Sequence, residues 1–249
     1  MYYCCGITEK GVMDHNEDAM LVGKTAIDYG ATEQKLSPPF IAAVSDGVSG
    51  ELSGELASRT CIELVRDIKY SKKVNLSKKL MEVHEKLAEI GSENSDNRNM
   101  QATLCGIAVD ENDRILAVNV GDSRLYRFRG GHLRQLSRDQ SLVQLLYEEG
   151  SITKEERRTH VHRNIIFPVL GNLNSKPEIA AWELEDIQYG DILLLCTDGL
   201  SDYVSPIAIE EILELPKSLP TRLQQLVKTA LDNGSEDNIT VIAVVYCEA

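Results

Sequence analysis

Two stretches of the chain share one pattern: FIAAVSDG at Phe40–Gly47 and DILLLCTDG at Asp191–Gly199. Each is an apolar run that predicts a buried strand, followed at once by Asp-Gly. Each strand therefore delivers a carboxylate at its carboxyl end, and the glycine permits a turn that a side chain would obstruct. An isolated Asp-Gly is most often a plain turn. Its occurrence twice, each time after an apolar strand, favours a functional interpretation.

Two further acidic segments have the opposite polarity. Glu17 and Asp18 come directly before the apolar run Ala19–Val22, and Asp237 comes shortly before Ile239–Ile242. If these strands run antiparallel to the first two, all the carboxylates reach one edge of the sheets. Such a cluster repels itself and must take up protons or bind cations. An all-oxygen site without cysteine or histidine suits Mg²⁺, Mn²⁺ or Ca²⁺ and not Zn²⁺. The spacing alone does not name the reaction.

The composition limits the class of protein. The chain has 249 residues, of which 43% are hydrophobic, and a formal net charge of -13. This length is enough for one large domain or two small ones, and the apolar content is enough for a substantial core. Nucleic acid and anionic membrane surfaces are poor partners for so acidic a chain, because long-range charge repulsion opposes their approach. The acidity either serves bound cations or only keeps the protein soluble.

The cysteines and the first residues indicate a cytoplasmic protein. None of the six cysteines forms a CxxC pair, and most lie in or beside apolar runs, so we expect all of them to be reduced. We also expect no signal peptide, since the first residues lack a basic start and an apolar stretch. No apolar run approaches the roughly 20 residues that a membrane-spanning helix needs.

Strand and helix patterns are mixed along the chain. Apolar, β-branched runs predict strands at Phe40–Val44, Ile115–Val120, Ile192–Cys196 and Ile239–Tyr246, and runs this apolar indicate sheets covered on both faces. Alternation around Gly130-Gly131 predicts a hairpin over Arg124–Ser137. Helical periodicity and its stop signals predict helices at Ser53–Ile68, Leu76–Ile90, Leu142–Glu149, Ile207–Leu215 and Leu219–Leu231. We expect a loop at Asn94–Asn99 and a surface insertion, not a second domain, at 140–178.

Seven short motifs follow one another in an order that resembles a known family. They are Asn16–Asp18, Val44–Gly50, Ala102–Leu104, Val120–Arg124, Arg138–Ser141, Cys196–Asp202 and Gly234–Thr240. Any one of them is weak evidence, whereas all seven in order and across nearly the whole chain are specific. The chain is similar to the protein phosphatase 2C (PPM) family of metal-dependent serine/threonine phosphatases. Ser141–Gly171 resembles the flap of its compact bacterial members.

The resemblance implies an α+β fold, a four-layer αββα sandwich of two mostly antiparallel sheets flanked by helices. Residues 1–249 would form a single PPM-type phosphatase domain, with a flap subdomain at about 140–178. The implied activity is hydrolysis of phosphoserine and phosphothreonine in proteins by a water that bridges two Mn²⁺ or Mg²⁺ ions. This reaction would reverse the action of a bacterial serine/threonine kinase.

The resemblance also implies roles for the carboxylates. Asp46 would bridge the two ions, since its carboxylate has two oxygens, and the Gly47 carbonyl would be an additional ligand. Asp198 and Asp237 would hold one ion and Glu17 the other. Catalysis would depend on Asp46, Asp198 and Asp237. Asp18 would be either a ligand or a residue that fixes its neighbours.

Each of three further aspartates has two alternative roles. Asp122 and Asp202 match positions that carry a third, weaker metal ion in bacterial members. In the structural alternative, Asp122 is a hydrogen-bonded turn residue and Asp202 caps a helix. Asp139 would either brace the acidic cluster or orient the flap loop.

The chain departs from the family pattern at two positions. Met13 stands where many members have an arginine that grips the substrate phosphate, and methionine cannot donate the bidentate hydrogen bonds of arginine. We expect weaker phosphate binding, unless Lys10 or another cation substitutes. Val48 stands where some members have a histidine that protonates the leaving group, so water would serve instead. His15 lies nearby in sequence, but a lone histidine beside a site is more often structural or exposed.

Other functions fit parts of the pattern. A pseudophosphatase that binds phosphoproteins or a kinase is favoured only by Met13, and the intact aspartates oppose it. A metallohydrolase of small phosphate esters is not excluded by the acidic surface. A Ca²⁺-stabilised structural domain is opposed by the absence of an EF-hand loop in the sequence. We expect a monomer whose partners are phosphorylated proteins.

Overall fold

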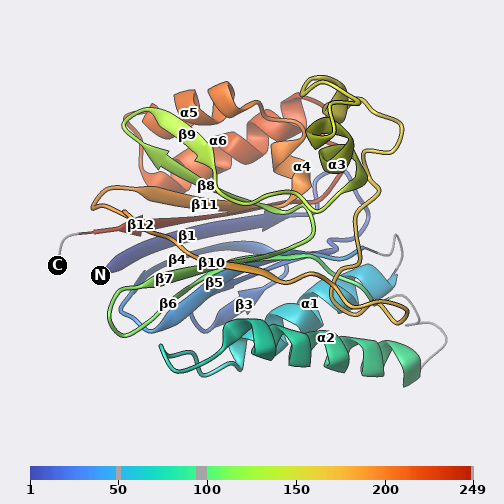
Figure 1. The fold of residues 1–249 in the computed structure, drawn as a ribbon. Helices are drawn as coiled ribbons and strands as arrows, with labels where there is room; N and C mark the ends of the chain where they lie inside the picture. Colours follow the sequence, from blue (N-terminus) through green and yellow to red (C-terminus); the bar gives the residue numbers. More distant parts are fainter. Residues whose placement is uncertain (49–51, 94–99, 248–249) are drawn as a thin grey trace.

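The computed structural model describes residues 1–48, 52–93 and 100–247. Within them, two six-stranded sheets stack face to face, with helices on the outer side of each sheet (Figure 1). The first sheet, sheet A, has the order β4-β1-β12-β11-β8-β9. Its strands are β1 (Tyr2–Glu9), β4 (Gly30–Leu36), β8 (Arg124–Arg129), β9 (His132–Gln135), β11 (Ile192–Cys196) and β12 (Ile239–Tyr246). The chain thus enters sheet A both near its beginning and at its end.

The second sheet, sheet B, has the order β10-β7-β6-β5-β2-β3. Its strands are β2 (Asp18–Val22), β3 (Thr25–Ile27), β5 (Phe40–Asp46), β6 (Leu104–Val109), β7 (Ile115–Val120) and β10 (Ala180–Glu183). All the strand pairs described in the two sheets are antiparallel. The expected four-layer αββα sandwich is confirmed.

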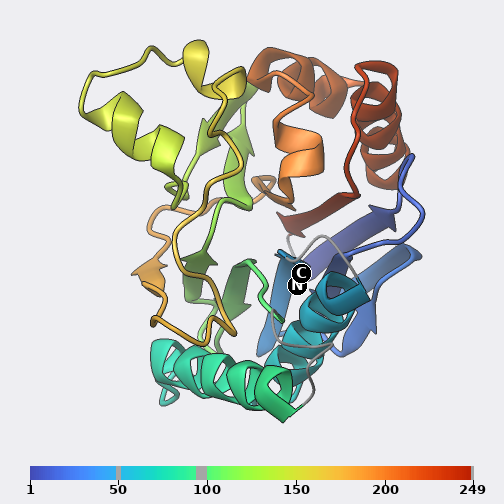
Figure 2. The same cartoon turned by 90° about the vertical axis from the view of Figure 1, so that its right-hand side faces the viewer.

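The helices form the two outer layers. They are α1 (Leu52–Arg66), α2 (Leu76–Glu93), α3 (Leu142–Glu148), α4 (Asp198–Ser201), α5 (Pro206–Glu214) and α6 (Leu219–Asp232), with a 3-10 turn at Glu156–Arg158. Helices α1 and α2 cover sheet B, and α4, α5 and α6 cover sheet A (Figure 1). Helix α3 and the chain that follows it lie to one side of these layers (Figure 2).

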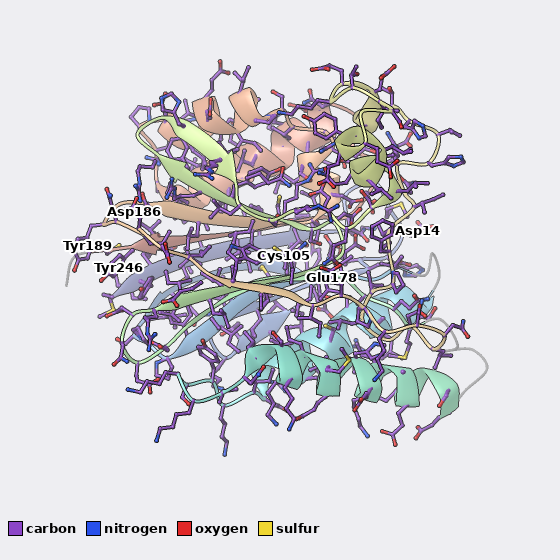
Figure 3. The ribbon with its side chains drawn as sticks, in the orientation of Figure 1. Asp14, Cys105, Glu178, Asp186, Tyr189 and Tyr246 are labelled. Carbon is purple, nitrogen blue, oxygen red and sulfur yellow. The ribbon has the colours of Figure 1, made fainter. Side chains whose placement is uncertain are left out.

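The core consists of three apolar layers. The middle layer fills the space between the sheets and includes Cys105, which Figure 3 shows between them. One outer layer packs α5 and α6 on sheet A, and the other packs α1 and α2 on sheet B. Leu223 of α6 is fully buried in the first of these, and its replacement by alanine would cost about 2–5 kcal/mol. Strands with apolar residues on both faces are therefore covered on both faces, as predicted.

The predicted elements are present with small shifts at their ends. All four predicted strands, the five helices and the hairpin are confirmed. In the hairpin, Gly130 and Gly131 have φ of 55° and 80°, the left-handed values that a tight two-residue turn requires. Helix α6 begins after Ser218, whose hydroxyl accepts a hydrogen bond from the Thr221 amide, and it ends before Asn233. The expected loop at Asn94–Asn99 lies outside the described residues.

The predicted strand polarity is also confirmed. Strand β2 pairs antiparallel with β5, so that Asp18 lies opposite Asp46. Strand β11 pairs antiparallel with β12, so that Cys196 lies opposite Val241. The acidic strand ends of the two sheets therefore reach the same end of the sandwich. Figure 3 shows Asp14, in the loop that leads to Glu17, at that end, far from Tyr189 and Tyr246 at the other.

In the described parts of the chain, we find no helix that is long and apolar enough to cross a membrane.

Candidate active site

A pocket of about 560 Å³ opens where the acidic strand ends of the two sheets meet. Its lining is Met13, Glu17, Asp46, Gly47, Val48, Gln101, Asp122, Asn164, Ile166, Asp198 and Asp237. The pocket therefore collects every predicted metal ligand except Asp18 and Asp202.

Asp46 is held at the end of β5 by Thr103, which directly precedes the neighbouring strand β6. The Asp46 amide donates to the Thr103 hydroxyl at 3.0 Å, and the Thr103 amide donates to the Asp46 carbonyl at 2.8 Å. The next amide, that of Gly47, donates to the Glu17 carbonyl at 3.0 Å. A Cβ added at Gly47 would lie 2.0 Å from the Gly54 carbonyl oxygen of α1. Only glycine fits there, because that oxygen belongs to the backbone.

Glu17 is held by an asparagine from the far end of the chain. Asn238 accepts the Glu17 amide through Oδ1 at 2.7 Å, and its Nδ2 donates to the carbonyls of Lys10 and His15 at 3.0 and 2.8 Å. Asn238 directly follows Asp237, so one side chain ties the two acidic segments together. This role of Asn238 could not be predicted from the sequence, although the residue lies in the motif Gly234–Thr240.

Asp198 begins the four-residue helix α4. A Cβ at the next residue, Gly199, would lie 1.9 Å from the Asn238 carbonyl oxygen, so this turn also requires glycine. Oδ1 of Asp198 is buried and has no hydrogen-bond partner among the described residues. A buried acceptor without a partner costs about 1–3 kcal/mol. The atom is therefore a candidate ligand for a cation.

Asp18 lies behind the pocket and does not line it. Its side chain is buried and accepts a hydrogen bond from the Thr197 hydroxyl at 2.8 Å. The same hydroxyl accepts the Thr240 amide at 3.1 Å. Of the two roles expected for Asp18, these contacts favour the one that fixes neighbouring ligands.

The carboxyl groups of the site have raised pKa values. Burial, and then the charge of Asp198, raises the pKa of Asp46 well above its usual range. Burial and the charge of Asp122 do the same to Asp198. Burial raises the pKa of Asp122 and of Asp18 to about 7 each. Burial also raises that of Asp237, against the lowering effect of the Asn238 amide. The charges of Arg124 and Arg163 lower the pKa values of Asp122 and Asp237, respectively, but do not cancel the effect of burial.

The site fits hydrated divalent ions. Its donors are oxygens, the choice of Mg²⁺ and Mn²⁺, and Asp198 offers an oxygen without a partner. Among the described residues, no group of three or more acidic, histidine or cysteine side chains lies close enough together to hold a metal ion directly. The carboxylates thus face a shared pocket and are more spread out than a single tight cluster. This spacing suits an ion such as Mg²⁺, which keeps several waters and takes one or two carboxylates.

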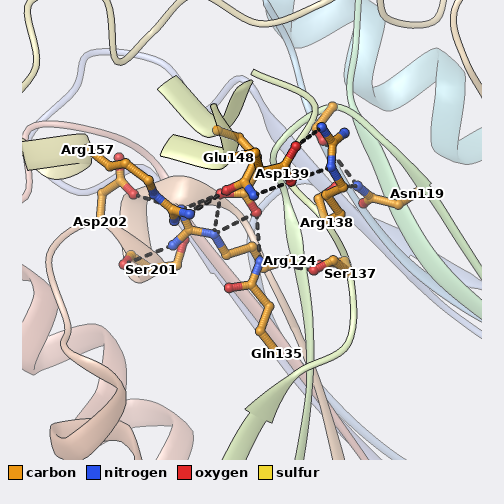
Figure 4. Close-up of polar contacts among 12 residues, drawn as sticks. Asn119, Arg124, Gln135, Ser137, Arg138, Asp139, Glu148, Arg157, Ser201 and Asp202 are labelled. Carbon is orange, nitrogen blue, oxygen red and sulfur yellow. Dashed lines mark hydrogen bonds and ion pairs between the residues drawn. The ribbon is translucent and has the colours of Figure 1, made fainter. Parts of the chain in front are cut away.

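Beside the pocket, an arginine whose side chain is 14% exposed organises a second polar group (Figure 4). Arg124 binds Asp139 through Nε and Nη2, at 3.0 and 2.7 Å, and lies 3.5 Å from Asp202. Asp139 also accepts from Gln135 at 2.8 Å and lies 3.7 Å from Arg157 of the 3-10 turn. Asp139 therefore contacts both Arg124, which reaches Asp202, and Arg157 of the 140–178 segment. These contacts are compatible with both of its expected roles, which are to brace the acidic cluster and to orient the flap loop.

Asp202 lies away from the main pocket. It lines a small adjoining pocket of about 30 Å³, together with Asp122 and the three arginines Arg124, Arg157 and Arg163. This volume is about that of one water molecule. An ion shared by Asp122 and Asp202 would have to compete with the contact between Asp202 and Arg124.

The departures from the family pattern lie at the pocket itself. Met13 and Val48 line it, and the Met13 side chain is 42% exposed. Lys10 and His15 are exposed and do not line the pocket. Within the described ranges, the sequence neighbours of Met13 thus supply no cation to the pocket wall.

Comparison with known proteins decides the family. The sequence profile described as Protein phosphatase 2C matches residues 22–239. The chain belongs to the protein phosphatase 2C family. The family is one of metal-dependent protein phosphatases, so the expected enzyme class is confirmed.

Individual members of the family match over nearly the whole chain. The serine/threonine phosphatase stp of Listeria welshimeri is 32% identical over 247 residues, which cover 95% of this chain and 93% of that protein. Stp1 from Staphylococcus aureus, a serine/threonine phosphatase of known structure, has a TM-score of 0.84 at 28% identity and covers 100% of this chain and 96% of its own. The catalytic domain of the phosphatase PstP, in complex with two manganese ions, has a TM-score of 0.78 at 29% identity and covers 100% of both chains. None of these comparisons supports the pseudophosphatase alternative.

Proposed function

We propose that this chain hydrolyses phosphoserine and phosphothreonine esters of proteins in a metal-dependent reaction that reverses the action of a serine/threonine kinase. One observation carries the proposal: carboxylates from both sheets line a single pocket, and the Asp198 carboxylate there has a buried oxygen without a partner. Such an arrangement is costly unless cations occupy it. The relatives named above are serine/threonine phosphatases, which points to the same reaction.

The site would hold two Mn²⁺ or Mg²⁺ ions. When bound, they supply an activated water as the nucleophile and offset charge on the phosphoryl oxygens. Asp46, at the end of β5, would be a ligand of the ions, and the Gly47 carbonyl would be an additional one. Asp198 and Asp237 would hold one ion, and Glu17 would hold the other. The two manganese ions in the PstP complex support a pair of ions here.

The remaining aspartates serve these ligands. Asp18 fixes the strand ends through Thr197. Asp122, which lines both pockets, and Asp202 would hold a third ion, in competition with the contact between Asp202 and Arg124. The number of bound ions is measured by removing all metal from the protein and then titrating it with Mn²⁺ in a calorimeter. Two tight sites and one weaker site that Asp202→Asn abolishes are expected.

The 249 residues form one phosphatase domain in this proposal, with residues 140–178 as a flap beside the pocket. Asn164 and Ile166 of this segment line the pocket, which supports the proposal. The net charge of -13 disfavours nucleic acid and membrane surfaces as partners. We further propose a monomer that acts in the cytoplasm in signalling, on phosphoproteins made by a partner kinase.

The substrate class is tested with two esters. Phosphate release from a phosphothreonine peptide and from glucose 6-phosphate is measured with Mn²⁺, with Mg²⁺ and with a chelator. Metal-dependent release from the peptide, at a kcat/KM at least 100-fold above that for the sugar phosphate, is expected. Equal or better turnover of the sugar phosphate would replace protein substrates with small phosphate esters.

A further inference from the structure

Among the described residues that line the pocket, none has a positively charged side chain that could bind a phosphate group. Apart from its acidic residues and Gly47, the described lining consists of Met13, Val48, Gln101, Asn164 and Ile166. A phosphoryl group has three oxygens that accept hydrogen bonds, and metal ions do not occupy all of their lone pairs. Only the carboxamides of Gln101 and Asn164 can donate to the remaining positions from side chains of this wall. Asn164 is exposed in the loop after the 3-10 turn, whereas Gln101 is half-buried.

The direction of the Gln101 amide follows from its neighbours. Oδ1 of Asn172 accepts hydrogen bonds from the backbone amides of Asn174 and Ser175, both at 3.0 Å. Backbone amides can only donate, so this atom must be the oxygen and the other end of Asn172 must be its NH₂. That NH₂ donates to Oε1 of Gln101 at 2.8 Å. The oxygen of Gln101 is therefore engaged, and its NH₂ group remains as the donor.

The backbone at Gln101 is fixed on both sides. Its carbonyl accepts the Val48 amide at 2.8 Å, next to the Asp46-Gly47 turn. The following residue, Ala102, exchanges two hydrogen bonds with Leu170, at 3.0 and 3.1 Å. Gln101 is thus attached both to the strand that delivers Asp46 and to the end of the 140–178 segment. A side chain with its backbone and its oxygen held in this way loses little conformational freedom when a ligand binds.

We infer that Gln101 binds the substrate phosphate through its side-chain NH₂ group and that Asn172 is the positioning residue that turns this group towards the pocket. The inference rests on the proposed function and adds to it the protein contact that serves in place of a cation. Because this donor is neutral, its contribution to phosphate binding should come from the hydrogen bond and not from long-range attraction.

Two substitutions of similar size test the inference. Gln101→Leu removes the donor but keeps the shape. Asn172→Asp keeps the oxygen that accepts the two backbone amides but replaces the NH₂ with a second oxygen. Gln101 must then turn round to donate to this oxygen, and its own oxygen faces the phosphate. Gln224→Leu, at an exposed position of α6, is the matched control.

The readouts separate binding from structure. We measure KM and kcat for a phosphothreonine peptide, Ki for inorganic phosphate, the Mn²⁺ concentration for half activation and the melting temperature. Gln101→Leu should raise KM and Ki by roughly 10- to 100-fold, the effect of a lost hydrogen bond to a charged group. The Mn²⁺ requirement and the melting temperature should stay within error. Asn172→Asp should have a similar effect in the wild-type background and almost none when leucine occupies position 101.

Each outcome decides a distinct point. Unchanged KM and Ki in Gln101→Leu, with an active wild type, would overturn the inference and leave the proposed function intact. An Asn172→Asp effect of equal size in both backgrounds would overturn the positioning role. If the wild type hydrolyses no phosphopeptide, the proposed function fails. Calorimetric titration of the Mn²⁺-loaded protein with inorganic phosphate then tests Gln101 separately: tenfold weaker binding by Gln101→Leu supports the assignment, and equal binding refutes it.

Discussion

Asp198→Asn should stabilise the metal-free protein while it abolishes activity. Asp198 has a buried oxygen without a hydrogen-bond partner in the described part of the chain. Burial, and then the charges of Asp122 and Asp237, raise its pKa. Asparagine has nearly the same shape and no charge to lose. The substitution therefore removes an electrostatic cost from the folded state, together with a ligand that catalysis requires.

The sign of the pH dependence follows from the raised pKa. Above the pKa of an unfolded aspartate, about 3.9, the folded protein holds a proton on Asp198 that the unfolded chain has released. Because the folded state binds more protons, stability falls as pH rises, by at most about 1.4 kcal/mol per pH unit for one group. The loss continues until the pH reaches the folded pKa. The Asp198→Asn protein lacks this loss, so its stability relative to the metal-free wild type should increase from pH 5 to pH 7.

The expected magnitude is moderate because neighbouring carboxyls share the effect. The advantage of Asp198→Asn should increase by about 2 kcal/mol between pH 5 and pH 7, below the limit of one fully independent group. For a chain of this size, that corresponds to about 4–8 °C in melting temperature. Thermal and guanidinium unfolding in the presence of a chelator, at pH 5, 6 and 7, measures it. With Mn²⁺ the order should reverse, because the wild type binds the ions more tightly.

Two results would contradict the predicted gain in stability of Asp198→Asn. One is a metal-free Asp198→Asn protein that is less stable than the wild type at pH 7. The other is an equal stability difference at all three pH values. Either result would mean that the Asp198 carboxyl has adequate interactions in the metal-free folded protein and does not need a cation.

Three further substitutions probe other parts of the site. Met13→Arg should lower KM for a phosphothreonine peptide by about five- to tenfold, because it adds a bidentate phosphate donor to a pocket whose described lining has no cationic side chain; an unchanged KM in steady-state assays would mean that the position does not face the phosphate. Arg124→Leu should destabilise the protein by about 3–5 kcal/mol in guanidinium unfolding, since it leaves Asp139 buried without its main partner; Arg124→Leu with Asp139→Leu should recover much of this loss, and a double variant as unstable as the single one would contradict that cause. Gly47→Ala should abolish detectable Mn²⁺-dependent turnover, because its Cβ would lie 2.0 Å from the Gly54 carbonyl oxygen; near-normal turnover would show that α1 can move aside.

The acidic strand ends could be predicted because they depend on local pattern. An apolar run that ends in Asp-Gly specifies both a strand and the position of its carboxylate, so Asp46 and Asp198 could be placed from the sequence. Strand β1 was missed for a physical reason. Gly6 interrupts its pattern, yet a Cβ there would lie 2.7 Å from the Met20 sulfur of the other sheet. A long-range contact between sheets thus explains this glycine, and no local rule shows it.

The supporting contacts of the site could not be predicted, because they join residues far apart in the chain. Asn238 holds the Glu17 amide across 221 positions, and Thr197 holds Asp18 across 179. Asn172 turns Gln101 across 71 positions. Each of these side chains is a common polar residue whose partner is set by strand pairing or loop geometry. Asp18 illustrates the limit, since sequence alone left it either a ligand or a support.

Hydrolysis of phosphoprotein substrates should depend on Asp46 and on the metal ions that it would hold. The most direct test of this dependence is the initial rate of phosphate release from a phosphothreonine peptide for the wild type and Asp46→Asn, with Mn²⁺ and with a chelator. We predict turnover by the wild type with Mn²⁺ only, and a loss of at least 1000-fold in Asp46→Asn, although the variant remains folded. Turnover that survives the chelator or the substitution would contradict the account.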